Sequence, residues 1–306
     1  MLKLMATRSA LMSIFLAMLT PAGARAANPS QSAHSREFWR AIVKNRFAVP
    51  ADEQVYPLIE ELNGYLGSTD PELRDDLAYS VIGVWVRHQD LSTTQLNRLA
   101  DEWRANLRAG IGESGTDTVF KRSFSALCLA SLAHREFRSP FLGPQRYAEL
   151  LSAALTYLHD ERDLRGFDPS KGWIHATAHT ADLLANLAAN PLLAPQDQPR
   201  LLRALAERLS SAHVIFSYGE QDRLANVAAV IVQRKDFDHA AFQRWLNDLN
   251  TDQKVWDQSP PRLELLRTFE NDSYLLEALA AHLSAAPENP QTVEARQAVL
   301  KILERR

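Results

Sequence analysis

Two histidines and an aspartate recur at helical spacing in one stretch of the sequence. His175, His179 and Asp182 stand at positions i, i+4 and i+7, which would place the three side chains on one face of an α-helix. Two histidines four residues apart can bind one metal ion from a helix face, and a nearby carboxylate can join them or orient them. The sharpest hypothesis is therefore a site for a divalent transition metal at these three residues.

The rest of the sequence leaves other interpretations of this stretch open. A fourth metal ligand would have to come from a neighbouring part of the fold, with Glu113, Asp117 and Glu220 as candidates. The His-Glu-x-x-His motif is absent, so the general base of a zinc protease is missing. A polar ligand pocket and a pair of hydrogen-bonded structural histidines remain as alternatives.

Motifs for other chemistry are weak. The segment Gly110-Ile-Gly-Glu-Ser-Gly115 matches G-x-G-x-x-G, but it follows a predicted helix where a dinucleotide site needs a strand, so we interpret it as a loop. The sequence contains neither G-x-S-x-G nor Ser-x-x-Lys, and nothing selects a pair of carboxylates for a glycosidase.

The sequence pattern predicts that the elements which position these residues are a succession of helices, with few segments typical of strands. Acidic residues that open apolar helices recur at intervals of about 50 residues, at Asp70, Asp117, Asp168, Glu220 and Asp272. The predicted helices span 35–46, 52–66, 70–86, 92–107, 119–133, 145–159, 168–188, 199–212, 224–232, 239–250, 274–283 and 291–306. The helix that carries the two histidines is expected to begin at Asp168, because Asp-Pro suits a helix start.

Each repeat pairs an outer amphipathic helix with an inner apolar helix. This alternation is typical of an all-α, HEAT-like α-solenoid, and a closed α/α toroid would produce the same pattern. The sequence does not separate the two arrangements.

Parallel inner helices would gather their N-terminal ends, and the polar residues near those ends, at one surface. Free N–H groups at helix starts favour anionic ligand groups. The predicted ligand-binding groove consists of Arg74, Asp75, Asp117, Arg122, Trp173, His175, His179, Asp182, Tyr218, Glu220 and Arg223. The alternative is that the acids only cap helices and the arginines only pair with them.

The first 26 residues differ in composition from the rest of the chain. Basic residues precede an apolar run over 10–19, and Ala24-Arg-Ala26 resembles a cleavage site, which predicts a secretory signal peptide over 1–26 and a single helical-repeat domain over 27–306. We therefore expect a periplasmic or secreted protein with no membrane span in its mature form. A formal charge of −3 argues against nucleic acid as a partner.

Four segments resemble a known bacterial family over roughly residues 50–260. They begin at Ser68-Thr-Asp-Pro-Glu-Leu-Arg-Asp75, Gly110-Ile-Gly-Glu-Ser-Gly-Thr-Asp117, Asp163-Leu-Arg-Gly-Phe-Asp168 and Tyr218-Gly-Glu220, and the third continues through Gly172-Trp-Ile-His-Ala-Thr-Ala-His179. The chain resembles the domain-of-unknown-function family 2785. The resemblance implies a helical bacterial protein and supplies no activity.

These observations favour an exported helical-repeat protein that binds a peptide, a partner protein or a small molecule in the polar groove around the His175 helix. The alternative is a metal-dependent hydrolase or another enzyme that uses the same groove.

Overall fold

Helices account for nearly all of the regular structure in the computed structural model, which describes residues 34–249, 255–257 and 259–306. This confirms the all-α prediction. The predicted signal peptide, residues 1–26, lies outside the described residues. Within the described residues, no helix combines the length and the apolar composition needed to cross a membrane.

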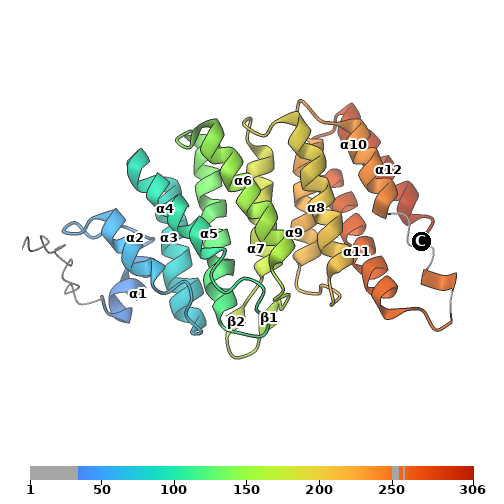
Figure 1. Cartoon of the computed structure of the whole chain (residues 1–306). Helices are drawn as coiled ribbons and strands as arrows, with labels where there is room; N and C mark the ends of the chain where they lie inside the picture. The colour runs from blue at the N-terminus through green and yellow to red at the C-terminus, as the bar shows by residue number, and fades with distance from the viewer. Residues whose placement is uncertain (1–33, 250–254, 258) are drawn as a thin grey trace, which may run out of the picture. The chain divides into compact units, whose positions relative to one another are not determined.

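The helices follow one another with short connections. Their bounds are α1 Arg36–Lys44, α2 Val55–Asn63, η1 Glu72–Tyr79, α3 Ser80–His88, α4 Thr93–Asn106, α5 Thr118–Arg138, α6 Gly143–Asp160, α7 Ala176–Ala189, η2 Pro195–Asp197, α8 Gln198–Ser211, α9 Glu220–Val232, α10 His239–Leu249, α11 Leu263–Ala285 and α12 Pro290–Leu303. A two-stranded hairpin, β1 Phe167–Asp168 and β2 Gly172–Trp173, precedes α7 (Figure 1).

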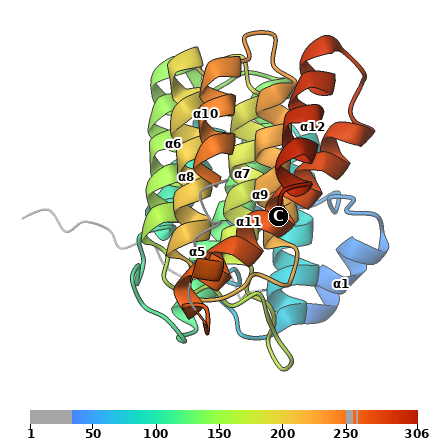
Figure 2. The ribbon, with the colours of Figure 1, turned by 90° about the vertical axis from the view of Figure 1, so that its right-hand side faces the viewer.

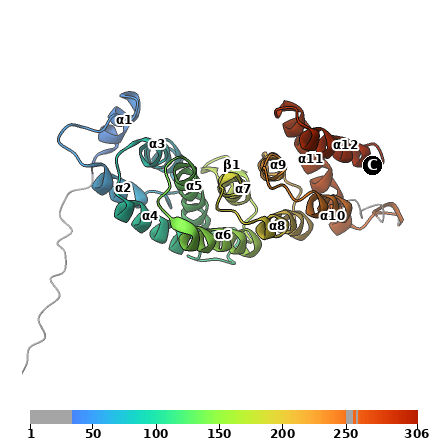
Figure 3. The same cartoon turned by 90° about the horizontal axis from the view of Figure 1, so that it is seen from above.

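Two rows of helices make up the unit His34–Arg306. In the first row α3, α5, α7, α9 and α11 each contact the next, and in the second row α6 contacts α8 and α8 contacts α10 (Figures 2 and 3). The two rows pack on each other through pairs such as α4 with α5 and α6 with α7.

The residue pattern explains which helices lie inside. Helix α7 is built largely of alanine and leucine and is buried on most sides, and its alanines let neighbouring helices approach closely. Helix α8 buries one side, which carries the leucines Leu201, Leu202, Leu205 and Leu209, and exposes charged residues such as Arg203 and Glu207 on the other.

The start of the histidine-bearing helix differs from the prediction. Residues 167–173 form an antiparallel hairpin in which Phe167 pairs with Trp173, and α7 begins only at Ala176. The Asp168 carboxylate accepts hydrogen bonds from the backbone N–H groups of Ser170 and Lys171, so it stabilises the hairpin turn and not a helix start. The predicted helix over 168–188 was therefore wrong in its first two turns.

The predicted acidic helix starts are confirmed only in part. Asp70 accepts hydrogen bonds from the N–H groups of Glu72 and Leu73, as a capping residue does, and Glu220 is the first residue of α9. Asp272, in contrast, lies buried in the middle of α11, which begins nine residues earlier at Leu263. The amphipathic turns before Asp272 continue the same helix, so the prediction of a helix start there was wrong.

Candidate functional site

Exposed aromatic rings and buried imidazoles meet where the hairpin joins the N-terminal ends of α7 and α9. We call this the hairpin site and define it as Phe167, Trp173, His175, His179 and Tyr218. Its residues come from β1, from β2, from the residue before α7, from the first turn of α7 and from the loop before α9. The hairpin lies at one end of the helix rows (Figure 1).

The three aromatic side chains of the hairpin site are exposed to solvent. Phe167, Trp173 and Tyr218 are 39%, 43% and 48% exposed. Their ring centroids are 4.9 Å apart for Phe167 and Trp173, and 6.4 Å apart for Trp173 and Tyr218. An exposed aromatic cluster is unusual on a soluble protein and is typical of a surface that binds something.

His175 has a left-handed backbone conformation, with φ at +48°. This region is unfavourable for residues other than glycine, and such strain clusters at functional sites. The imidazole stacks on Trp173 at a centroid distance of 4.4 Å, and Nε2 lies 3.0 Å from the carbonyl oxygen of Tyr218. A carbonyl can only accept a hydrogen bond, so Nε2 of His175 carries the hydrogen and Nδ1 is unprotonated in the neutral ring.

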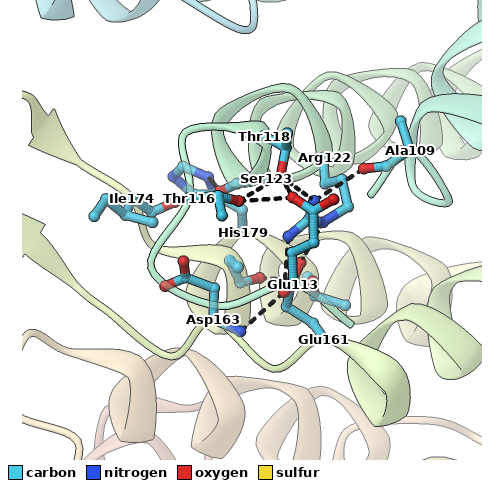
Figure 4. Close-up of polar contacts among 12 residues, drawn as sticks. Ala109, Glu113, Thr116, Thr118, Arg122, Ser123, Glu161, Asp163, Ile174 and His179 are labelled. Atoms are coloured by element: carbon cyan, nitrogen blue, oxygen red, sulfur yellow. Dashed lines mark hydrogen bonds and ion pairs between the residues drawn. The ribbon is translucent and has the colours of Figure 1, made fainter. Parts of the chain in front are cut away.

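The hydrogen bonds of Ser123 fix the tautomer of His179 in the same way. The Ser123 hydroxyl donates its one hydrogen to the carbonyl oxygen of Ile174, and Nδ1 of His179 lies 2.8 Å from the Ser123 Oγ (Figure 4). Nδ1 must therefore donate to Oγ, which leaves Nε2 of His179 unprotonated. Nε2 makes no hydrogen bond with the described residues.

Burial keeps both imidazoles neutral. It lowers the pKa of His175 to about 4, against the opposing effect of the hydrogen bond to Tyr218. It lowers the pKa of His179 well below its ordinary value, and His175 and Arg223 lower it further. The hairpin site therefore holds two neutral rings, each with one unprotonated nitrogen that can accept a hydrogen bond or a proton from a ligand.

The predicted metal set is not assembled. The ring centroids of His175 and His179 lie 5.7 Å apart at nearly a right angle, and the Asp182 carboxylate forms an ion pair with Arg223 at 2.5 Å. No group of three or more His, Cys, Asp or Glu in the part of the chain that the structure describes could hold a metal ion. The physical reason is the late start of α7, because His175 precedes the helix and does not share a helical face with the other two residues.

Two charged contacts fasten the hairpin to the first inner helices. The buried Arg74 guanidinium donates to the carbonyl oxygens of Lys171 and Trp173 at 2.7 and 3.2 Å, and the Lys171 ammonium pairs with Asp117 at 2.6 Å. Arg74 also pairs with Asp75 at 2.7 Å, and burial raises the pKa of Asp75 to about 6 in spite of that partner. Arg74, Asp75 and Asp117 thus position the hairpin.

Arg74 and Asp75 lie in η1, a π-helical segment of a kind that is often found near functional sites.

Arg122 was predicted to line the groove, but it is fully buried and points inward. Its guanidinium makes two hydrogen bonds to the Glu161 carboxylate, at 2.7 and 3.0 Å (Figure 4). Burial is the largest single influence and lowers the pKa of Arg122, but the hydrogen bonds to Glu161 together with the nearby negative charges, that of Glu161 first, leave the pKa above its ordinary value. The prediction for Arg122 was wrong because α5 turns this position toward the segment that follows α6, where Glu161 is a buried partner.

Glu220 and Arg223 lie at the start of α9, as predicted. The Glu220 carboxylate is 2% exposed and accepts a hydrogen bond from the backbone N–H of Tyr218 at 2.9 Å, so it holds the loop that carries the Tyr218 ring. Gly166 packs directly against it, since a Cβ at Gly166 would lie 2.6 Å from Glu220 Oε1. Burial raises the pKa of Glu220, and nearby backbone N–H groups oppose this effect.

The predicted ligand-binding groove left out Phe167, Ser123 and Glu161. The run Asp168-Pro-Ser-Lys-Gly172 between Phe167 and Trp173 has the composition of a tight turn, and that signal could have revealed the hairpin and its exposed Phe167. No local pattern marks Ser123 or Glu161, because their partners lie 56 and 39 residues away in the sequence.

A search of curated proteins and a search of solved structures each gave no match to this chain. A family model described as a protein of unknown function (DUF2785) matches residues 107–280, a stretch that includes every residue of the hairpin site. The match covers more than half of the sequence, and the chain therefore belongs to the DUF2785 family.

Proposed function

We propose that this chain is an exported helical-repeat protein that binds a ligand at the hairpin site. One observation carries the proposal: three exposed aromatic rings lie beside two neutral imidazoles whose unprotonated nitrogens accept no hydrogen bond from the residues that the structure describes. The ligand would offer a ring to stack on Trp173 and hydrogen-bond donors for the imidazoles. A sugar ring has both features, and so does a peptide with an aromatic or proline side chain.

We also propose that the helix pairs form an open α-solenoid. In support, α1 contacts η1 and α3 near the beginning of the first row, while α12 contacts α11 and α9 near its end. A closed toroid would instead bring the two ends of the row together. Open repeat arrays commonly present extended binding surfaces.

The proposed binding site is tested by removing the Trp173 ring. Soluble oligosaccharides and short peptides containing aromatic or proline residues are titrated into the protein by calorimetry. For a ligand that the wild type binds, Trp173→Ala should weaken binding roughly tenfold, because stacking contributes about 1 kcal/mol beyond the area that it buries.

Trp256 provides a matched control for this experiment. It is also exposed, at 62%, but it contacts Phe269 and no residue of the hairpin site. Trp256→Ala should leave the affinity unchanged. Equal affinity of wild type and Trp173→Ala for every ligand that binds would refute the proposal.

A further inference from the structure

We propose that a second site, between α6 and α8, binds a small ligand through its phosphate groups. A cavity of about 540 Å³ lies there, within the usual size of small-molecule sites. Four arginines line it, and we call it the arginine cavity after them: Arg162, Arg200, Arg203 and Arg208. The arginine cavity shares no residue with the hairpin site, so an experiment can refute either proposal without affecting the other.

Positive charge in the arginine cavity is not neutralised by its own lining. Glu207 is the one acidic residue among the residues that line it. Arg200 pairs with Asp197 at 2.6 Å, whereas Arg162 and Arg203 make no hydrogen bond or ion pair with the described residues. Two exposed guanidinium groups that line the cavity therefore have no partner among the described residues.

Arg208 adds a buried charge that also lacks an acidic partner. It is 3% exposed, and its Nη2 donates only to backbone carbonyl oxygens at the C-terminal end of α6, those of Leu158, His159 and Glu161. The nearby Glu161 carboxylate is paired with Arg122, and Arg208 reaches only the backbone carbonyl oxygen of Glu161. Burial, followed by the charge of Arg162, lowers the pKa of Arg208 to about 10.

The Nε of Arg208 is buried without a hydrogen-bond partner. A buried charge with unsatisfied donors is unfavourable unless something compensates it. A phosphate group in the cavity would supply both the negative charge and the acceptor oxygens, in the geometry that guanidinium groups favour.

Neighbouring cavities show that the excess of arginine is specific to this position. Similar spaces of about 600 and 530 Å³ lie between α4 and α6 and between α8 and α10. The first combines Arg104 and Arg108 with Asp101, Glu149 and Asp160, and the second combines Arg203 and Arg244 with Glu207, Asp248 and Asp272. The packing of successive outer helices explains why a cavity lies between each pair. It does not explain why the arginine cavity is lined by four arginines and only one acidic residue.

The test is titration of inorganic pyrophosphate into the mature protein by calorimetry at low salt, with the double variant Arg162→Gln/Arg203→Gln. Both side chains are exposed, so the variant should fold, which a melting curve checks. We expect saturable binding by the wild type and a loss of affinity of roughly tenfold or more in the double variant, since the variant removes two charged donors that would bond to the phosphate oxygens. Arg244→Gln, in the neighbouring cavity that two arginines and three acids line, should bind as the wild type does.

A second arm separates a soluble phosphate ligand from a lipid headgroup. The same proteins are sedimented with vesicles of phosphatidylglycerol and, as a neutral reference, of phosphatidylcholine. If the wild type sediments with phosphatidylglycerol vesicles but not with phosphatidylcholine vesicles, and the double variant sediments with neither, the phosphate is that of a lipid headgroup. The proposal is overturned if neither pyrophosphate nor the anionic vesicles bind saturably, or if the double variant binds either of them as well as the wild type.

Discussion

At the scale of the residue, the hydrogen-bond partners of His175 and His179 determine which nitrogen of each ring carries a hydrogen. The Ser123 hydroxyl has one hydrogen and the Tyr218 carbonyl has none, and these two facts determine the tautomers of His179 and His175. Burial then keeps both rings neutral. The unprotonated nitrogen of each ring can therefore accept a hydrogen bond from a donor such as a hydroxyl or amide group.

The neutral state of His175 predicts how its contribution to stability depends on pH. Its folded-state pKa of about 4 lies below the ordinary value of 6.5. At pH 7 the ring is neutral in both states. As the pH falls below 6.5, the unfolded chain binds a proton that the folded chain does not, so the folded state loses stability until the pH reaches about 4.

We test this with His175→Asn, because asparagine tolerates the left-handed conformation. Urea unfolding should show that the substitution is less destabilising at pH 5 than at pH 7, by about 2 kcal/mol. The raised pKa of Asp75 acts in the opposite direction, but it is common to both proteins and cancels in the comparison. His213→Asn, at an exposed histidine, serves as the control, and an effect of His175→Asn that is the same at both pH values would contradict the prediction.

At the scale of the element, buried charged side chains fasten the hairpin and the loop before it to neighbouring helices. Arg74 connects η1 to the hairpin, and Arg122 connects α5 to the residue that follows α6. Asp163 continues this connection, because its carboxylate accepts from the N–H of Gly115 at 2.9 Å and pairs with Arg165 at 2.6 Å. The glycine-rich loop is thus held by a fully buried aspartate.

Breaking the Arg122–Glu161 pair should destabilise the fold strongly. Both side chains are at most 3% exposed, so Arg122→Met leaves a carboxylate buried without its partner and should cost about 3–5 kcal/mol of unfolding free energy. The double variant Arg122→Met/Glu161→Gln removes both charges and should recover a large part of that loss in urea unfolding.

The exposed pair Arg104–Glu149 is the control for this cycle. Its side chains are 32% and 43% exposed, and Arg104→Met should change the stability by less than about 1 kcal/mol. Additive effects of the two substitutions at Arg122 and Glu161 would show that the pair is not coupled.

At the scale of the whole molecule, the hairpin site depends on how the helix rows bring distant segments together. Tyr218 and His175 are 43 residues apart, and Ser123 and His179 are 56 residues apart. They meet because α5, α7 and α9 lie next to one another with their starts at the same end. These three helices therefore contribute residues from their starts, or from the loops before them, to one surface.

Export is the prediction that belongs to this scale. Produced in a bacterial host with two membranes, the protein should be recovered from the periplasm or the medium, and mass spectrometry should place its first residue at Ala27. Ala26→Gln puts a large residue at the cleavage position and should leave the precursor uncut. Recovery of the wild type in the cytoplasm with residues 1–26 still attached would contradict the proposal.

By itself, the sequence determined the helical class, the approximate bounds of most helices and the stretch from Trp173 to Asp182 as the place to look. These features follow from local periodicity, which depends on neighbouring residues only. The capping role of Asp70 also agrees with the prediction of a helix start at that residue.

Only the tertiary structure decided what the residues of that stretch do. It replaced two expected helical turns with a hairpin, exposed Phe167 and turned Arg122 inward to Glu161. It also gave His179 a serine partner in place of a metal set. Each outcome depends on a partner from another helix or loop, and the energy of a buried hydrogen bond or ion pair is set by that partner, which one-dimensional spacing does not record.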